Sequence, residues 1–460
     1  MSVKHIAALP LVLACAPSDD DVLVETVRPL VLATDLDPRS DVVEVAIEAV
    51  PGVVELVDGV PTSVLAYGER DSDAVVPGPL IEATVGDRLI VRFSNALPGL
   101  ATTVHWHGVR LPAAMDGNPM VSGVVEPGES FTYEFVLRDA GLYWYHPHVD
   151  SDVQAELGLQ GILLVHERDE IAVDRERIFV LDDVELAEDG SVVVELSRDD
   201  AMLGRRGPDI TINGGPPGRI VATLGSVERW RFVSTANGRY FAVAAEGLSF
   251  RVIGWDGGVV DGYDTDVLRI VPGERYDVLV RMPSHEASID VVTVPVDRGG
   301  GMADEEAHLF ELVVHGAGRE RAVLEPPASI APLDISSAQT RRFELTSALE
   351  GPGSPAFFIN GQRWPLDTHV HVRRGDVDVW EVVNEEDHAH PFHIHGLFFQ
   401  PLEVGGVAPR MLGWNDTIDI PPRATARLAV PYGELGMWMY HCQIFEHAER
   451  GMMGDLVVEE

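Results

Sequence analysis

The chain has 460 residues, which is too long for one compact core and predicts about two to four domains. Its formal net charge of −40 comes from 74 acidic and 34 basic residues. Such a surface repels nucleic acid and anionic membranes, so we expect neither as a partner. The apolar segments are too short to cross a membrane as helices. Each of the two cysteines, Cys15 and Cys442, has another predicted role, so we expect no disulfide.

The first 15 residues, MSVKHIAALPLVLAC, combine one lysine, a short apolar run and a cysteine that follows small or aliphatic residues. This pattern is typical of a bacterial lipoprotein signal, whose cleavage would leave Cys15 lipidated at the new N-terminus. The alternative is an ordinary cleaved signal peptide with an incidental cysteine. Residues 16–40 would then form an acidic tether. We therefore expect a protein of the periplasm or cell envelope that is lipid-anchored, or one that is otherwise secreted.

Two strand-like segments recur along the rest of the chain in three copies each. The copies of the first share a turn glycine followed by alternating apolar positions, and they lie at 85–95, 224–234 and 374–384. The copies of the second lie at 125–135, 270–280 and 420–430. A spacing of about 145 residues is far longer than that of solenoid repeats and indicates homologous domains. Short alternating runs bounded by Gly, Pro, Asn and Asp predict all-β Greek-key sandwiches. The expected domains span residues 41–167, 168–325 and 326–460.

Four short segments hold nine of the seventeen histidines: HWHG (105–108), HPH (146–148), HPFHIHG (390–396) and HCQIFEHAERGMM (441–453). In a strand, residues two apart project from the same face, so each His-x-His pair is a two-pronged ligand. One thiolate with two imidazoles and a distant methionine is the ligand set of a blue-copper centre. The chain has that set in His390, Cys442, His447 and Met452. A further pair, His369 and His371, lacks flanking glycines and a partner motif, and we interpret it as structural.

With these motifs in this order, the chain resembles the three-domain multicopper oxidases, the family of laccases, bacterial copper-tolerance oxidases and bilirubin oxidases. The resemblance implies three cupredoxin domains and four coppers, one of type 1, one of type 2 and two of type 3. The type 1 copper would be held by His390, Cys442 and His447, with Met452 as weak axial ligand. The type 2 copper would be held by His105 and His393. The type 3 pair would be held by His107 and His146 on one ion and by His148, His395 and His441 on the other.

The chain departs from the family pattern at two positions. Gln443 stands where the family's H-C-H run has its second histidine, and an amide oxygen is a poorer copper ligand than imidazole. One type 3 site is therefore expected to be weakened, or completed by a water or by the amide oxygen. Ala448 stands where relatives often carry a proton-relaying glutamate, and Glu449 is the nearest substitute. Asp116, in AAMDGNP, matches the family's cluster acid and is our candidate for orienting water and supplying protons.

The resemblance implies an oxidase that takes single electrons from a phenolic, aromatic amine or metal-ion donor through an exposed edge of His447. Cys442 and His441 would carry the electrons onward, and dioxygen would be reduced to water. The alternative hypothesis is a periplasmic copper-binding or copper-tolerance protein with a type 1 site and an incomplete trinuclear cluster. Because all copper motifs fall in the first and third domains, we expect the cluster between them and the second domain as a spacer. A monomer is expected.

Overall fold

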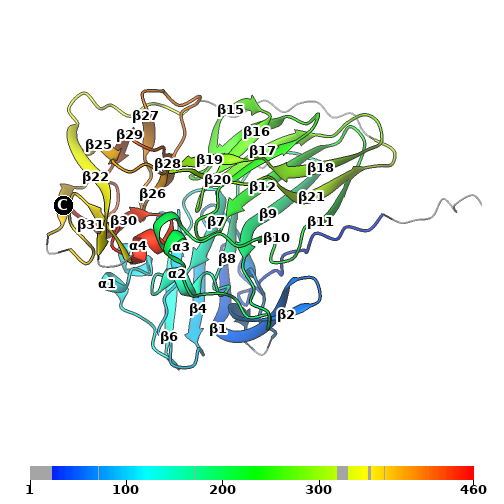
Figure 1. Ribbon diagram of the computed structural model, residues 1–460, viewed down its shortest axis with the longest axis horizontal. Helices are drawn as coiled ribbons and strands as arrows, with labels where there is room; N and C mark the ends of the chain where they lie inside the picture. Colours follow the sequence, from blue (N-terminus) through cyan, green and yellow to red (C-terminus); the bar gives the residue numbers. More distant parts are fainter. Residues whose placement is uncertain (1–22, 71, 170, 319–329, 351–353, 367) are drawn as a thin grey trace, which may run out of the picture.

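In the computed structural model the chain forms three consecutive units made of β-sheets, and each unit contains two larger sheets (Figure 1). The structure describes residues 23–70, 72–169, 171–318, 330–350, 354–366 and 368–460. The predicted signal peptide, Cys15 and the start of the predicted tether lie outside the described residues. The predicted domain boundary at residues 325 and 326 also lies outside them.

The first unit is built from eight strands: β1 (Val42–Val57), β2 (Val60–Glu69), β3 (Gly78–Thr84), β4 (Arg88–Asn95), β5 (His105–His107), β6 (Ser130–Val136), β7 (Gly141–His146) and β8 (Gly161–His166). They form one sheet in the order β2-β1-β4-β6 and a second in the order β3-β8-β7-β5. The two histidine pairs of this unit therefore lie close together, because β5 carries His105 and His107 and its neighbour β7 ends at His146, two residues before His148.

The second unit contains β9 (Arg175–Val184), β10 (Asp209–Ile212), β11 (Gly218–Ala222), β12 (Val227–Ser234), β13 (Phe241–Ala245), β14 (Phe250–Trp255), β15 (Val259–Thr265), β16 (Val267–Ile270), β17 (Arg275–Arg281), β18 (Ala287–Thr293), β19 (Val296–Gly299), β20 (Met302–Asp304) and β21 (Ala307–Val314). Its sheets run β10-β9-β12-β17-β14-β15 and β11-β21-β18-β13-β16. Strands β19 and β20 form a separate hairpin.

The third unit contains β22 (Gln339–Glu350), β23 (Ser354–Ile359), β24 (Val370–Arg373), β25 (Val377–Asn384), β26 (His390–Ile394), β27 (Gln400–Val404), β28 (Thr417–Ile420), β29 (Thr425–Pro431), β30 (Gly436–Cys442) and β31 (Met453–Glu459). Its sheets run β23-β22-β25-β29-β27 and β24-β31-β30-β26-β28. Strands β26, with His390 and His393, and β30, with His441 and Cys442, are neighbours.

The repeat found in the sequence forms the same strands in every unit. The copies of the first segment become β4, β12 and β25, and those of the second become β6, β17 and β29. Within each unit the two pair antiparallel. The first also pairs parallel with the opening strand of its unit, which is β1, β9 or β22. The prediction of an all-β fold with three β-sandwich units is confirmed.

The described helices are all short: η1 (Ala113–Met115), α1 (Pro119–Ser122), α2 (Ser151–Gln154), α3 (Arg198–Leu203) and α4 (Phe445–Glu449). Within the described ranges, none of the helices has the length and hydropathy that crossing a membrane requires. Helix α3 is capped at its N-terminus by Ser197, whose side chain accepts a hydrogen bond from the backbone N–H of Asp200. This cap stabilises a helix that is otherwise too short to persist alone.

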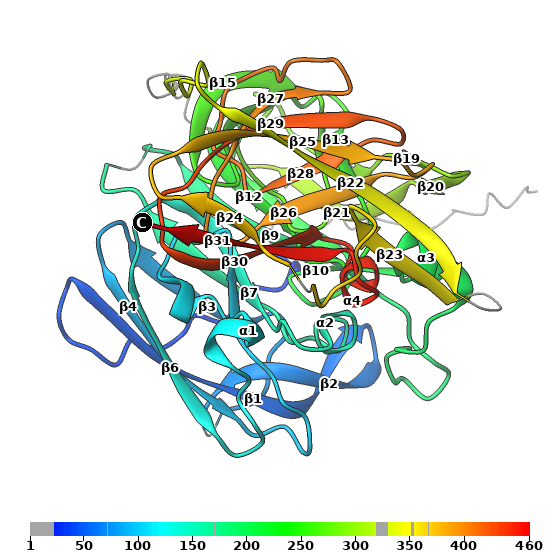
Figure 2. The ribbon, with the colours of Figure 1, turned by 90° about the vertical axis from the view of Figure 1, so that its left-hand side faces the viewer.

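The apolar core shows how the units are joined. One continuous cluster of buried side chains runs through the first and third units and includes Trp106, Trp380 and Trp438. The second unit has its own core around Trp230 and Phe250. Figure 2 shows strands of the first unit, in blue to cyan, lying beside those of the third, in yellow to red. Because burial of apolar surface contributes about 25 cal/mol per Å², this shared core holds the histidine-bearing strands of both units together.

Residues 23–36, part of the predicted tether, are bound to the fold rather than free of it. The N–H of Thr26 donates to the carbonyl of Arg219 in the second unit over 2.8 Å. The N–H of Leu80 in the first unit donates to the carbonyl of Val31 over 2.7 Å. Glu25 forms ion pairs with Arg175 and Arg177 at 2.8 and 2.9 Å. The segment therefore crosses the junction of the first two units.

A cluster of ion pairs stabilises one face of the second unit. Arg229 and Arg231 are 1% and 0% exposed, and both contact the carboxylate of Asp277. Arg229 also donates to Glu167, at the end of the first unit, over 2.7 and 3.1 Å. Burial alone would raise the pKa of Asp277, but Arg231 and Arg229 hold it below its usual value. Removing one partner of such a set leaves buried charge without compensation.

Asp277→Asn is therefore expected to lower the free energy of unfolding by about 3 kcal/mol at neutral pH. A carboxyl with a lowered folded-state pKa contributes stability above its unfolded value of about 3.9, and this is lost as the pH falls through the folded value. When urea unfolding is measured from about pH 7 to about pH 3, the difference in the free energy of unfolding between variant and parent should therefore decrease as the pH falls. The exposed Asp266→Asn is the control and should change little. A gap that is equal at every pH would contradict this account.

Candidate metal centre

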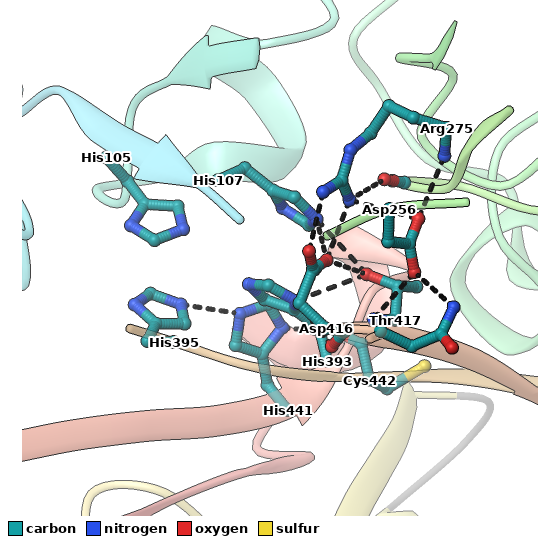
Figure 3. Close-up of polar contacts among 12 residues, drawn as sticks. His105, His107, Asp256, Arg275, His393, His395, Asp416, Thr417, His441 and Cys442 are labelled. Atoms are coloured by element: carbon teal, nitrogen blue, oxygen red, sulfur yellow. Dashed lines mark hydrogen bonds and ion pairs between the residues drawn. The ribbon is translucent and has the colours of Figure 1, made fainter. Parts of the chain in front are cut away.

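Strand pairing inside the first and third units brings the histidine motifs opposite one another. In the first unit, β5 and β7 are antiparallel with His105 opposite His146. In the third, β26 and β30 are antiparallel with His393 opposite His441. Figure 3 shows the side chains of His105 and His107 facing those of the third unit across the junction.

Seven buried histidines meet at this junction: His105, His107, His146, His148, His393, His395 and His441. The Nε2 atom of His441 lies 3.0 Å from Nε2 of His395 and 3.4 Å from Nε2 of His148. The ring of His105 stacks on that of His395 with centroids 3.8 Å apart. Ring nitrogens that face one another at this range form a set of converging donors, which suits a metal cation.

Four of these rings have one nitrogen without a hydrogen-bond partner: His105 Nε2, His107 Nδ1, His146 Nε2 and His393 Nε2. The opposite nitrogens of these rings lie 2.9 to 3.1 Å from Asp116 O, Thr417 Oγ1, Pro147 O and Asp416 O, in that order. A metal-ligating histidine has the same arrangement, because the hydrogen bond of one nitrogen orients the other toward the metal. The residues present therefore fit a metal cluster.

The protonation state of the rings fits metal binding as well. Burial lowers the pKa of His148 to about 3, with His105 and His393 adding to the effect. Burial also places the pKa of His395 and that of His441 well below the usual value. These imidazoles are neutral near pH 7, which is the form that binds a metal.

A second group of donors lies in the third unit around Cys442. The Sγ atom is 3.5 Å from Nδ1 of His390 and 3.6 Å from Nδ1 of His447, and those two nitrogens are 3.2 Å apart. Met452 is fully buried, and its carbonyl accepts from the N–H of Cys442. Burial raises the pKa of the Cys442 thiol, so a thiolate here needs a cation beside it. One sulfur and two imidazoles are a soft donor set that suits copper.

Profiles of the family described as multicopper oxidase match residues 59–170, 187–290 and 326–460. The chain is 30% identical over 453 residues to multicopper oxidase MmcO of Mycobacterium tuberculosis, an alignment that covers 85% of this chain and 82% of that protein. The chain belongs to the multicopper oxidases.

Solved structures agree with this family. A multicopper oxidase from Campylobacter jejuni, described as a metallo-oxidase, matches with a TM-score of 0.83 at 27% identity over 94% of this chain and 95% of that one. A laccase-like enzyme from Ochrobactrum sp., described as active towards lignin model compounds and lignosulfonate, matches with a TM-score of 0.80 at 27% identity, over 94% and 100%. The protein is thus a copper-dependent oxidoreductase that uses oxygen. The alternative of a copper-binding or copper-tolerance protein with a type 1 site and an incomplete trinuclear cluster is not favoured.

The prediction that one edge of the His447 ring is exposed to solvent is wrong. His447 is 0% exposed, and its Nε2 lies 3.1 Å from the carbonyl of Met202 on α3. Phe357 stacks on the face of the same ring with centroids 4.1 Å apart. The segment of the second unit that carries α3 therefore covers the ring, an arrangement that depends on how the units pack.

Gln443 is 1% exposed, and neither atom of its side-chain amide has a hydrogen-bond partner. Its backbone N–H donates to the carbonyl of Pro391 over 2.8 Å, which holds the residue between the two sites. A Cβ atom added to Gly273 of the second unit would lie 2.9 Å from both Gln443 Cγ and His107 Cε1, so these side chains are neighbours. A buried amide without partners costs free energy unless a ligand or water satisfies it.

The acidic candidates lie in different surroundings. Asp116 is fully buried, and its Oδ2 lies 2.8 Å from Nδ1 of His395. Glu449 on α4 accepts from the N–H and hydroxyl of Ser151 over 2.9 and 2.5 Å, so its hydrogen bonds join α4 to α2. Ala448 packs in a small apolar cluster with Met439 and Met453.

The third unit contains three further histidines. His369 and His371 bond through Nδ1 to the carboxylates of Asp455 and Glu459, at 2.5 and 3.2 Å. His388, which the sequence pattern did not single out, is buried beside His390 with ring centroids 4.6 Å apart. The only signal for it is its place two residues before His390.

The sequence motifs also missed a network under the cluster, formed by Arg275, Asp256, Asp416 and Thr417 (Figure 3). Burial alone would raise the pKa of Asp416, but Arg275, His107 and His393 hold it well below its usual value. No spacing rule marks these residues, because the partners lie in different units.

Proposed function

We propose that this multicopper oxidase binds four coppers through the side chains expected from its sequence. A type 1 copper uses His390, Cys442 and His447, with Met452 as axial ligand. A type 2 copper uses His105 and His393. The type 3 coppers use His148, His395 and His441 on one ion, and His107 and His146 on the other. The observation that carries this proposal is the convergence of buried, unpartnered ring nitrogens from the first and third units.

Copper supplies one-electron redox chemistry at both sites when it is bound. The chain itself supplies a covalent path between them, because Cys442 and His441 are consecutive residues. Asp116 keeps the ring of His395 in position through its Oδ2. Its Oδ1 is buried without a hydrogen-bond partner, 3.4 Å from Nδ1 of His105, which supports a role in orienting water and supplying protons to dioxygen. Glu449 is our second candidate proton donor.

The proposed donor is a phenol, an aromatic amine or a metal ion. The relatives described as a metallo-oxidase and as active towards lignin model compounds support these classes. An axial methionine suits easily oxidised donors, because it gives a modest type 1 potential. Since the Nε2 atom of His447 is covered by Met202, we propose that the donor docks over α3 and not on the ring itself.

We also propose that the domains span residues 41–167, 168–325 and 326–460, which is supported by the pair of sheets in each unit. A lipid anchor at Cys15 would place the enzyme in the cell envelope or periplasm, as the lipoprotein-like signal suggests. We propose a monomer, because the two metal sites draw their ligands from one chain.

Oxygen consumption by copper-loaded enzyme with a phenolic donor tests the function. Four donor electrons should be consumed for each dioxygen, with no peroxide released, because seven of the eight expected ligand positions of the cluster carry histidine and only that of Gln443 departs. The measurement couples an oxygen electrode to donor oxidation and a peroxide assay. Peroxide as the main product would show that the cluster does not complete the reduction. No uptake by enzyme whose blue centre the donor still reduces would favour one-electron transfer instead.

A further inference from the structure

Arg275 of the second unit reaches all three units beneath the metal cluster. Its side chain is buried, and Nη1 and Nη2 donate to the two carboxylate oxygens of Asp416 in the third unit over 2.7 and 2.5 Å. Nε donates to the carbonyl of Leu142 in the first unit, and Nη1 also donates to that of Gly273, each over 3.0 Å. A bidentate pair of this kind holds both partners in one geometry (Figure 3).

Asp416 in turn contacts two predicted copper ligands from different units. Its Oδ1 lies 3.2 Å from Nε2 of His107 and 3.4 Å from Nδ1 of His393. Its backbone carbonyl is 2.9 Å from the same nitrogen of His393. The hydroxyl of Thr417 donates to Asp416 Oδ1 over 2.9 Å, so the hydroxyl oxygen can accept from the two rings. This oxygen lies 3.1 Å from Nε2 of His107 and 3.2 Å from Nδ1 of His393.

These contacts select one nitrogen of each ring. The oxygens of Asp416 and Thr417 accept hydrogen bonds from the N–H at Nε2 of His107 and from the N–H at Nδ1 of His393. The atoms left without a partner are Nδ1 of His107 and Nε2 of His393. His107 thus presents the opposite nitrogen from His105 and His146, whose unpartnered atoms are both Nε2. A flexible imidazole does not prefer this orientation by itself, whereas an anchored carboxylate imposes it.

The second unit anchors the Asp416 segment at a further point. Asp256 accepts from the backbone N–H of Arg275 over 3.0 Å and from Nδ2 of Asn415 over 3.1 Å. Gly108, the glycine of the HWHG motif, has a φ of +82° and no space for a side chain, because a Cβ there would lie 2.7 Å from Asp416 Oδ2. Because this residue is glycine, the Arg275–Asp416 pair can pack closely against the end of the strand that carries His107.

We propose that Arg275 and Asp416 are positioning residues by which the second unit sets the copper affinity of the site at His107 and His146. The inference rests on the proposed ligand roles. This site depends most on ring orientation, since Gln443 stands where a third imidazole would be. The second domain is then part of the metal centre and more than the spacer expected from the sequence.

Copper titration of the full chain tests the proposal. Arg275→Leu is expected to weaken copper binding at the cluster by about 10- to 100-fold, the usual effect of removing a residue that orients a ligand. At limiting copper it should hold about one ion fewer than the parent, while the blue absorption of the Cys442 site is kept. Arg275→Lys keeps the positive charge but cannot donate the two parallel hydrogen bonds of the guanidinium, so its copper affinity should lie between those of Arg275→Leu and the parent. Arg229→Leu removes another buried arginine of the same unit and should bind copper like the parent.

The outcomes separate this proposal from the proposed function. Equal copper affinity and content in Arg275→Leu and the parent would overturn the positioning role alone. A parent that binds no copper at the cluster would overturn the ligand assignment itself. If Arg275→Leu shows no cooperative thermal unfolding, Thr417→Val serves instead, because it removes only the hydroxyl between Asp416 and His107. It should weaken copper binding in the same direction, and unchanged binding would count against the proposal.

Discussion

Cys442→Ser is expected to abolish oxidation of every donor and to remove the blue absorption. The Cys442 sulfur lies within 3.6 Å of the ring nitrogens of both His390 and His447, and a serine hydroxyl is a hard, neutral donor that does not suit the same copper. Loss of a residue that merely orients a ligand costs about 10- to 100-fold, so loss of the thiolate should cost more than about 100-fold. The measurements are donor oxidation rate, visible absorption and copper content.

The cluster histidines are untouched in this variant, so its copper content should fall by about one ion per chain and no further. Met453 is buried next to Met452, the proposed axial ligand, but belongs to a separate apolar cluster, so Met453→Leu should retain colour and activity. Retention of the blue band in Cys442→Ser would refute the assignment of the sulfur as ligand.

Gln443→His is expected to raise both the copper content and the rate of oxygen uptake, the latter by about 10-fold. The amide is buried without hydrogen-bond partners beside His107, so an imidazole placed there would supply a third nitrogen to the proposed site at His107 and His146. The measurements are copper per chain after dialysis and oxygen uptake with a saturating donor. Unchanged uptake at full copper loading in both proteins would contradict a limiting role for Gln443.

Gln443→Leu is the matched variant, because leucine is close in size and offers no donor atom. If the amide oxygen completes the site, Gln443→Leu should bind less copper than the parent. If a water completes it, the two should bind alike while Gln443→His still improves on both. The pair of variants therefore distinguishes the two interpretations that the sequence left open.

Strand periodicity and motif order predicted much of this protein correctly. Alternation of apolar residues is a local property, so the segments at 85–95 and 125–135 could be recognised as strands, and their recurrence revealed three related units. The paired histidines were also predictable as two-pronged donors, because residues two apart on a strand share a face. The donor set around Cys442 indicated copper, because the types of the residues determine which metal their donor atoms suit.

No pattern in the sequence predicted the contacts between units. Arg275 and Asp416 are 141 positions apart, and the burial of His447 depends on Met202, 245 positions away. Residue type and spacing determined the strands, the three units and the soft donor set, because local backbone geometry follows from local sequence. Only the packing of the three units decided which nitrogen of His107 is free, that His447 is covered and that the second unit reaches the cluster, because those depend on contacts that no local period encodes.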